Sequence, residues 1–277
     1  MKPFFLVTLM ILRFCTATAQ QPEGIPMTWK SDDHSPYAAL LLPVLMEGKS
    51  YQMQLDLGSP HSFLYKHLAP GDTARPAQLT IGPYKLNMAS MQVRDPGVKT
   101  ALAGTLGADI IRDKVVIFDY PNGMIYLEDS LPTRFYTRLY PFYFAGNRVL
   151  LPTSLLGKQV LLYFDTGSSA FELLTDSTSW RALSVKNASI ASYEINSWGR
   201  KLIVSTAASA DSIEVAGRRL PLNHVSYIQG ASEAQVSQMK KTGMGGMTGN
   251  TLFINHVLIL DTKRSLFGIL ESIPVKK

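Results

Sequence analysis

The sequence predicts an all-β protein built from two related halves. Short apolar runs rich in branched and aromatic residues alternate with Gly, Pro, Asn and Asp, and few windows keep a helical period beyond about ten residues. Two similar strings, at residues 55–59 and 164–169, each place an aspartate, a glycine and a serine after such a run. A glycine pattern also recurs at a constant spacing. Together these observations indicate a duplicated β unit.

The elements expected along the chain are short. Strands are predicted over residues 37–46, 51–55, 78–81 and 115–119, and short helices near residues 108–112, 177–183 and 232–241. A β-hairpin is predicted over residues 193–204, with Trp198 and Gly199 near its tip.

The repeat can be read from three anchors. Three residues of the first half recur 142 positions later, which gives the pairs Gly104 and Gly246, Gly107 and Gly249, and Asp119 and Asp261. The aspartates of the two strings, Asp56 and Asp165, are only 109 positions apart, so the second half holds 33 additional residues before its glycine anchor. Since residues 79–86 match residues 213–220 as hairpins with a glycine turn, the insertion falls at about residues 183–210.

The start of the chain predicts a secretory signal peptide. A positively charged start at Lys2, an apolar run over residues 3–12 and the small residues 17–19 indicate a signal peptide over residues 1–19 that is cleaved after Ala19. A membrane anchor is the rival interpretation, but Arg13 interrupts a run that is already short for a bilayer span, so we expect no stable membrane insertion. We therefore expect a secreted or periplasmic protein.

Composition excludes several classes of function. Cys15 is the only cysteine and leaves with the signal, so the mature chain has no disulfide and no Cys/His zinc pattern. Loss of Lys2 and Arg13 lowers the formal charge from +6 to +4, and the remaining basic residues are scattered. This distribution does not favour nucleic-acid binding. We expect no metal and no cofactor.

The paired motifs resemble those of the aspartic peptidases, both the bilobal pepsin-like enzymes and the retropepsins. The resemblance covers residues 37–127 and 142–270, most of the mature chain. Each half shows the family order of a hairpin, an Asp-x-Gly-Ser loop, a second hairpin, an apolar-glycine element, a short helix and a strand that ends in Asp. The implied fold is an all-β, duplicated two-lobed aspartic-protease-like barrel with a few short helices.

This resemblance divides the mature chain into four segments and implies a monomer, because both lobes lie in one chain. They are an N-terminal extension at residues 20–35, an N-terminal lobe without a clear flap at 36–131, a linker at 132–141 and a C-terminal lobe at 142–277.

The chemistry implied is hydrolysis of peptide bonds in a peptide or protein substrate by Asp56 and Asp165. Two carboxylates held a few Å apart cannot both ionise cheaply, so they share one proton. The ionised carboxylate takes a proton from a water while the protonated one donates to the scissile carbonyl. Because the pair titrates as a unit, the acid and the base are not assigned.

The neighbouring residues have implied supporting roles. Gly58 and Gly167 allow the two loops to approach closely. By resemblance, Ser59 and Ser168 hydrogen-bond the carboxylates, and the hydroxyl of Thr166 reaches across to the opposite loop.

Two features depart from the family pattern. Leu57 occupies the position of the first threonine, so half of a reciprocal hydrogen-bond pair is lost. The first half is too short for a flap hairpin, and the only candidate substrate cover is the hairpin with Trp198 and Gly199 in the second half. The alternative function is therefore a catalytically inactive module that binds extended peptides in the inter-lobe cleft. The separation of the two carboxylates distinguishes these hypotheses.

Overall fold

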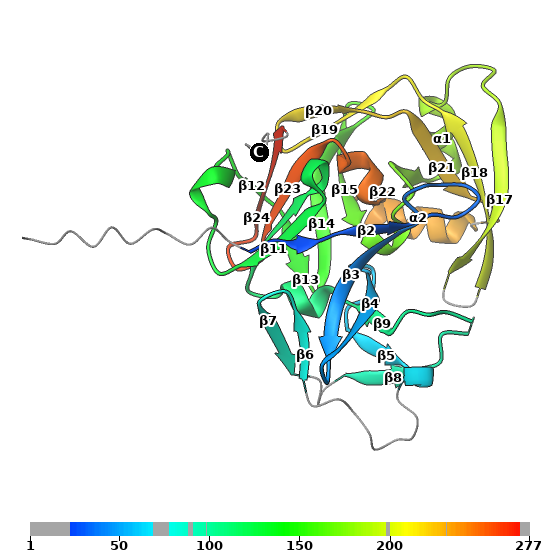
Figure 1. Ribbon diagram of the computed structural model, residues 1–277. Helices are drawn as coiled ribbons and strands as arrows, with labels where there is room; N and C mark the ends of the chain where they lie inside the picture. Colours follow the sequence, from blue (N-terminus) through cyan, green and yellow to red (C-terminus); the bar gives the residue numbers. More distant parts are fainter. Residues whose placement is uncertain are drawn as a thin grey trace, which may run out of the picture.

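The fold is described from a computed structural model that covers residues 23–68, 78–87, 91–97, 99–197, 200–230 and 232–271 (Figure 1). Within these residues the strands form three sheets: one for each half of the chain and one that both halves share. The signal peptide predicted over residues 1–19 lies outside the described residues.

The sheet of the first lobe has the order β7-β6-β3-β4-β9-β5-β8, with β2 paired to β3. Its strands are β2 (Thr28–Lys30), β3 (Ala39–Met46), β4 (Lys49–Leu55), β5 (Phe63–Tyr65), β6 (Gln78–Ile81), β7 (Tyr84–Asn87), β8 (Gln92–Arg94) and β9 (Gly104–Leu106). Along β3, Leu40, Leu42 and Val44 are buried at every second position. This alternation is why the segment forms a strand with one face in the core.

The sheet of the second lobe has the order β17-β18-β21-β16-β22-β15-β14-β19-β20, with β13 paired to β14. Its strands are β13 (Tyr143–Ala145), β14 (Arg148–Leu155), β15 (Lys158–Phe164), β16 (Leu174–Thr175), β17 (Ile190–Ser197), β18 (Arg200–Ala208), β19 (Ser212–Val215), β20 (Arg218–Pro221), β21 (His224–Ile228) and β22 (Met244–Thr248).

Strand pairing confirms the duplication. The strand before each aspartate runs parallel to the glycine-anchor strand, with Leu55 opposite Leu106 in one lobe and Phe164 opposite Thr248 in the other. These pairs reproduce the spacings of 109 and 142 residues. The two glycine-turn hairpins, β6–β7 and β19–β20, also pair with equivalent strands, β3 and β14.

The predicted insertion forms the long hairpin of β17 and β18, which pairs with β21 at the end of the second-lobe sheet. Figure 1 shows it as the tall yellow-green ribbon at the right. Tyr193, Ile195 and Val204 form a small apolar cluster with Leu174 and Met247. The tip residues Trp198 and Gly199 lie outside the described residues.

The third sheet joins the lobes in the order β1-β11-β10-β23-β24-β12. Its strands are β1 (Ile25–Pro26), β10 (Val115–Asp119), β11 (Met124–Glu128), β12 (Tyr140–Pro141), β23 (His256–Asp261) and β24 (Leu266–Glu271). At its centre β10 of the first lobe pairs antiparallel with β23 of the second. Val116 and Phe118 pack into the main core, whereas Val115 and Ile117 pack into a second cluster on the opposite face. Burial on both faces explains the continuous apolar runs.

The part of the N-terminal extension that the structure describes is integrated into the fold. Ile25 is fully buried and pairs with β11, and β2 pairs with β3. After β2 the chain reaches the second lobe, where the ring of His34 stacks on Tyr193 at 4.0 Å between ring centroids. The predicted linker contains the 3-10 turn η5 (Thr133–Phe135) and β12.

Helices are few and short, as the sequence predicts. The α-helices are α1 (Ser177–Leu183) and α2 (Glu233–Lys241), and the other short turns of helix are η1 (Lys66–Leu68), η3 (Ala108–Ile111), η4 (Tyr120–Asn122), η6 (Thr166–Ser168) and η7 (Asn250–Phe253). Asp176 caps α1 by accepting hydrogen bonds from the backbone N–H groups of Thr178 and Ser179. Among the described residues, no helix has both the length and the apolar character needed to cross a bilayer.

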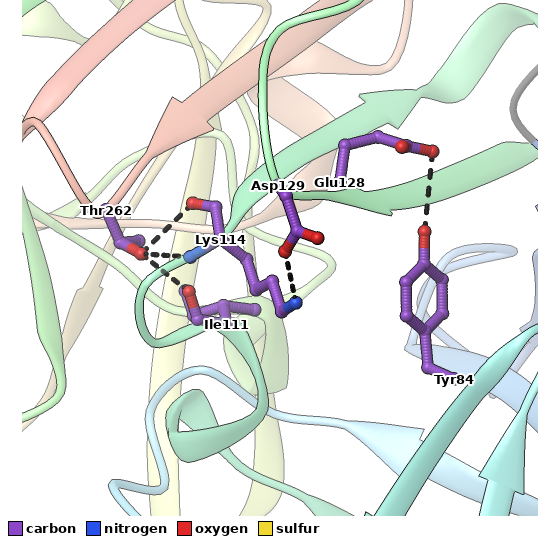
Figure 2. A network of polar contacts seen from close by, with 6 residues as sticks. All are labelled: Tyr84, Ile111, Lys114, Glu128, Asp129 and Thr262. Atoms are coloured by element: carbon purple, nitrogen blue, oxygen red, sulfur yellow. Dashed lines mark hydrogen bonds and ion pairs between the residues drawn. The ribbon is translucent and has the colours of Figure 1, made fainter.

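A buried threonine adds hydrogen bonds between the lobes next to the shared sheet. The Thr262 hydroxyl donates to the carbonyl oxygen of Ile111 at 2.6 Å and accepts from the N–H of Lys114 at 3.1 Å (Figure 2). The Lys114 ammonium forms a separate ion pair with Asp129 at 2.6 Å, and 87% of the Asp129 side chain is exposed. The hydrogen bonds of Thr262 therefore stabilise this contact between the lobes, whereas the ion pair is exposed to solvent and adds little.

We expect Thr262→Val to lower the free energy of unfolding by about 0.5–1.5 kcal/mol, because the Lys114 N–H and the Ile111 carbonyl lose their hydroxyl partner and keep only their mutual hydrogen bond of 3.3 Å. Chemical denaturation measures this change. Asp129→Asn is the matched control and should unfold like the unmodified protein, because solvent screens its ion pair. Equal destabilisation by the two variants would contradict this assignment.

Candidate active site

The first aspartate loop follows directly from β4. The N–H of Asp56 donates to the carbonyl oxygen of Leu106 on β9 at 2.9 Å, which continues the strand pairing into the loop. The Asp56 carboxylate accepts hydrogen bonds from the N–H groups of Gly58 at 2.9 Å and Ser59 at 3.1 Å. The loop therefore turns around its own carboxylate and fixes its orientation.

The second loop repeats this arrangement after β15. The N–H of Asp165 donates to the carbonyl oxygen of Thr248 on β22 at 2.9 Å, and the N–H of Gly167 donates to the Asp165 carboxylate at 2.8 Å. In addition, the Ser168 hydroxyl donates to the other carboxylate oxygen at 2.8 Å. The two loops thus present their carboxylates in the same way from the two lobes.

The two glycines bring the carboxylates together. A Cβ atom at Gly58 would overlap the Asp165 carboxylate, and a Cβ atom at Gly167 would overlap the Asp56 carboxylate. Each loop can therefore lie against the opposite aspartate only because it carries glycine at this position. The side chains of Asp56 and Asp165 lie beside each other and interact directly. The carboxylates form a contacting pair.

Burial and mutual repulsion change how this pair titrates. Asp56 is 8% exposed and Asp165 is 9% exposed. Desolvation, followed by repulsion from Asp165, raises the pKa of Asp56 to about 7, although the N–H donors of Gly58 and Ser59 oppose the shift. The Asp56 carboxyl group therefore retains its proton to near neutrality. One neutral and one ionised carboxyl group can donate and accept a proton at the same site.

Thr166 crosses between the loops as the resemblance implies. Its buried hydroxyl accepts from the N–H of Leu57 at 2.8 Å and donates to the carbonyl oxygen of Leu55 at 2.8 Å. Leu57 is fully buried in the hydrophobic core and offers no hydroxyl in return. The hydrogen-bond pair at the base of the two aspartates is therefore one-sided.

Ser59 differs from the sequence expectation. Its hydroxyl donates to the carbonyl oxygen of His61 at 2.7 Å, and only its backbone N–H contacts Asp56. The Oδ1 atom of Asp56 already accepts hydrogen bonds from two N–H groups, so the Ser59 hydroxyl donates to the nearby carbonyl of His61 instead. Of the two serine hydroxyls, therefore, only that of Ser168 contacts a carboxylate.

Asn250 is a supporting residue that sequence reasoning missed. Its amide nitrogen donates to the carbonyl oxygen of Thr166 at 3.2 Å and to the Ser169 hydroxyl at 2.9 Å. Its amide oxygen accepts from the buried Tyr120 hydroxyl at 2.7 Å. Asn250 occupies the repeat position of Ala108, so an amide in place of a small apolar residue was the available signal.

An apolar cavity of about 320 Å³ lies beside the second loop. Its apolar lining includes Tyr163, Leu174, Val236, Met239, Met244 and Met247. The Met247 sulfur lies 3.1 Å from the Ser168 hydroxyl oxygen. Because the Ser168 hydroxyl donates to Asp165, one side chain connects the wall of this cavity to the carboxylate pair.

Two further sequence expectations concern the substrate cover at Trp198 and Gly199 and the metal-binding capacity of the chain. Trp198 and Gly199 lie outside the described residues, while the hairpin that carries them packs against Leu174 and Met247 of the cavity wall. Within the described ranges, no three His, Cys, Asp or Glu side chains are grouped so that they could hold a metal ion.

Comparison with known proteins identifies the fold. No protein-family model matches the chain, and no curated protein matches it in sequence. Among solved structures, the aspartic proteinase from Irpex lacteus matches with a TM-score of 0.54, over 90% of this chain and 97% of that one. The sequence identity is 10%, so this likeness establishes the fold alone. The chain has the all-β, two-lobed fold of an aspartic proteinase.

The pKa of Asp56 predicts how stability depends on pH. A carboxyl group whose pKa is higher in the folded than in the unfolded state stabilises the fold at low pH, and this contribution is lost as pH rises through the folded pKa, here about 7. We expect the unmodified protein to lose stability between about pH 4 and pH 8 relative to Asp56→Asn, which removes the titrating group.

Thermal unfolding of both proteins across this pH range measures the difference. The exposed variant Asp129→Asn is the control and should parallel the unmodified protein above pH 5. Parallel curves for the unmodified protein and Asp56→Asn would contradict the raised pKa.

Proposed function

We propose that this protein is a secreted aspartic endopeptidase-like hydrolase that cleaves peptide bonds with a water activated between Asp56 and Asp165. One observation carries the proposal: each loop glycine lies against the opposite aspartate, so that two buried carboxyl groups contact each other. Splayed carboxylates would instead have favoured the binding hypothesis.

The pair can perform the proton transfers that hydrolysis of an amide requires. The ionised carboxylate removes a proton from the attacking water, and the neutral carboxyl group donates its proton to the scissile carbonyl oxygen. The carboxyl group that gained a proton then donates it to the leaving amine nitrogen as the C–N bond breaks, and the other carboxylate takes a proton from a hydroxyl of the tetrahedral intermediate. The N–H groups of Gly58 and Gly167 and the Ser168 hydroxyl hold the oxygens in orientation. Since Asp56 has a pKa of about 7, activity should extend from acidic to nearly neutral pH.

The apolar cavity supports a substrate with an apolar side chain near the cleaved bond. Three methionines line it, and unbranched methionine side chains adapt to side chains of different shape. We propose that the β17–β18 hairpin, with Trp198 and Gly199 at its tip, covers a bound extended peptide. The hairpin already contacts the cavity residues Leu174 and Met247.

Export and a monomeric state belong to the same proposal. The signal over residues 1–19 would direct the chain to the periplasm or the exterior, and a chain with both lobes needs no second copy to complete the pair. N-terminal sequencing of the exported protein should find residue Gln20 first, and light scattering should give the mass of one chain.

Leu57 favours a second candidate, a catalytically inactive module that binds extended peptides. It removes one of the two reciprocal hydrogen bonds beneath the carboxylates, and such a loss would be tolerated in a protein that only binds. In this case the cavity and the hairpin would hold a peptide without turnover.

Peptide hydrolysis by the mature chain decides between the two candidates. We expect denatured protein and peptide-library substrates to be cleaved between about pH 3 and pH 8. Asp56→Asn and Asp165→Asn should each lower kcat by at least about 10²- to 10⁴-fold, because each removes a group that transfers a proton. Mass spectrometry of the products measures cleavage.

The exposed variant Asp129→Asn controls for the change of charge and should retain full activity. If the unmodified protein binds peptides but leaves them intact, and both active-site variants bind equally well, the binding module is correct and the hydrolase is not.

A further inference from the structure

Leu57 leaves the first aspartate loop without its own cross-lobe hydroxyl, yet the second lobe contacts this loop at two further points. The Tyr163 hydroxyl donates a hydrogen bond to the carbonyl oxygen of Gly58 at 3.0 Å and lies 3.3 Å from that of Leu57. Tyr163 is on β15, two residues before Asp165. β15 therefore carries a contact to the opposite loop and leads directly into the loop of Asp165.

Asn147 provides the second contact. It lies in the turn between β13 and β14 with φ of 58°, a left-handed conformation that asparagine tolerates. Its amide nitrogen donates to the carbonyl oxygen of Pro60 at 2.7 Å, and its amide oxygen accepts from the Arg112 guanidinium at 2.7 Å. Only 5% of Asn147 is exposed. Both ends of this buried amide are thus hydrogen-bonded to the first lobe.

In the described part of the chain, the first-lobe counterparts of Tyr163 and Asn147 make no such hydrogen bonds to the second loop. The positions 109 residues before Tyr163 and Asn147 are Gln54 and Ala38. An alanine side chain cannot hydrogen-bond, and among the described residues no hydrogen bond runs from the Gln54 side chain to the second loop. The hydrogen bonds of Tyr163 and Asn147 to the loop that contains Leu57 are therefore specific to the second lobe.

The two ends of Tyr163 have separate surroundings. Its ring forms part of the cavity wall, whereas its hydroxyl points to the first loop. Burial and the nearby Asp165 and Asp56 carboxylates raise the pKa of Tyr163 to about 12 against the opposing Arg148 guanidinium, so the phenol remains a hydrogen-bond donor throughout the working pH range. Removal of the hydroxyl alone would remove this contact to the loop and leave the cavity wall in place.

We propose that Tyr163, assisted by Asn147, is a positioning residue that holds the Asp56 loop against Asp165 in place of the hydroxyl that Leu57 lacks. This inference rests on the proposed hydrolase function. It acts through geometry: the two carboxyl groups must stay in contact to share a proton, and a small displacement of one loop separates them.

The test uses Tyr163→Phe, which keeps the ring in the cavity wall. We expect kcat to fall about tenfold while KM changes less than about twofold, because one buried hydrogen bond is lost and the wall is retained. Addition of Leu57→Thr to this variant should restore kcat to within about threefold of the unmodified protein by supplying the missing hydroxyl. Tyr136→Phe, at a tyrosine that is 65% exposed, is the matched control and should change nothing.

A second readout does not depend on activity. If Tyr163→Phe lets the carboxylates separate, the pKa of Asp56 falls, and the loss of thermal stability between pH 4 and pH 8 becomes smaller than in the unmodified protein. Asn147→Gly, which keeps the left-handed turn and removes the amide, should change this pH dependence in the same direction.

These outcomes separate the positioning role from the proposed function. The inference is wrong if Tyr163→Phe leaves both kcat and the pH dependence of stability unchanged. It is also wrong if adding Leu57→Thr to Tyr163→Phe restores neither kcat nor the pH dependence of stability. If the unmodified protein cleaves no peptide, the hydrolase proposal fails, and the pH dependence of stability alone then decides whether Tyr163 positions the loop.

Discussion

The close approach of two glycine loops is the constraint on which the rest of the structure depends. Gly58 and Gly167 each lie where a Cβ atom would overlap the opposite carboxylate, so the lobes can meet at this point only without side chains. The parallel pairs β4–β9 and β15–β22 fix each loop within its lobe, and the shared pairing of β10 with β23 fixes one lobe against the other. Rigid sheets thereby keep two mutually repelling carboxyl groups in contact.

The second lobe supplies most of the support for this contact. Thr166 donates to and accepts from the first loop, and Tyr163 and Asn147 donate to its carbonyl groups. The Ser168 hydroxyl reaches a carboxylate, whereas that of Ser59 does not. The cavity and the inserted β17–β18 hairpin also belong to the second lobe. The duplicated halves have therefore diverged into a supporting lobe and a supported one.

Much of the fold could be predicted because repeats and periodicity are local in the chain. The constant spacings of 142 and 109 residues reappear as strand pairs, and the inserted segment forms the expected hairpin. The candidate site was less accessible. Asn250, Tyr163 and Asn147 lie in ordinary strand or turn sequences, and their importance comes from partners about 80 to 130 residues away. The Ser59 hydroxyl differed because a nearby carbonyl competed for it.

The sequence by itself determined the all-β duplicated architecture and the identity of the two aspartates, since alternating burial and repeated motifs are written along the chain. Only the tertiary structure decided that these carboxylates touch, that burial raises the pKa of Asp56 to about 7, and that Tyr163 reaches the Leu57 loop. The physical reason is that proximity and desolvation arise between segments that fold together from distant parts of the chain, and neither is a property of any one segment.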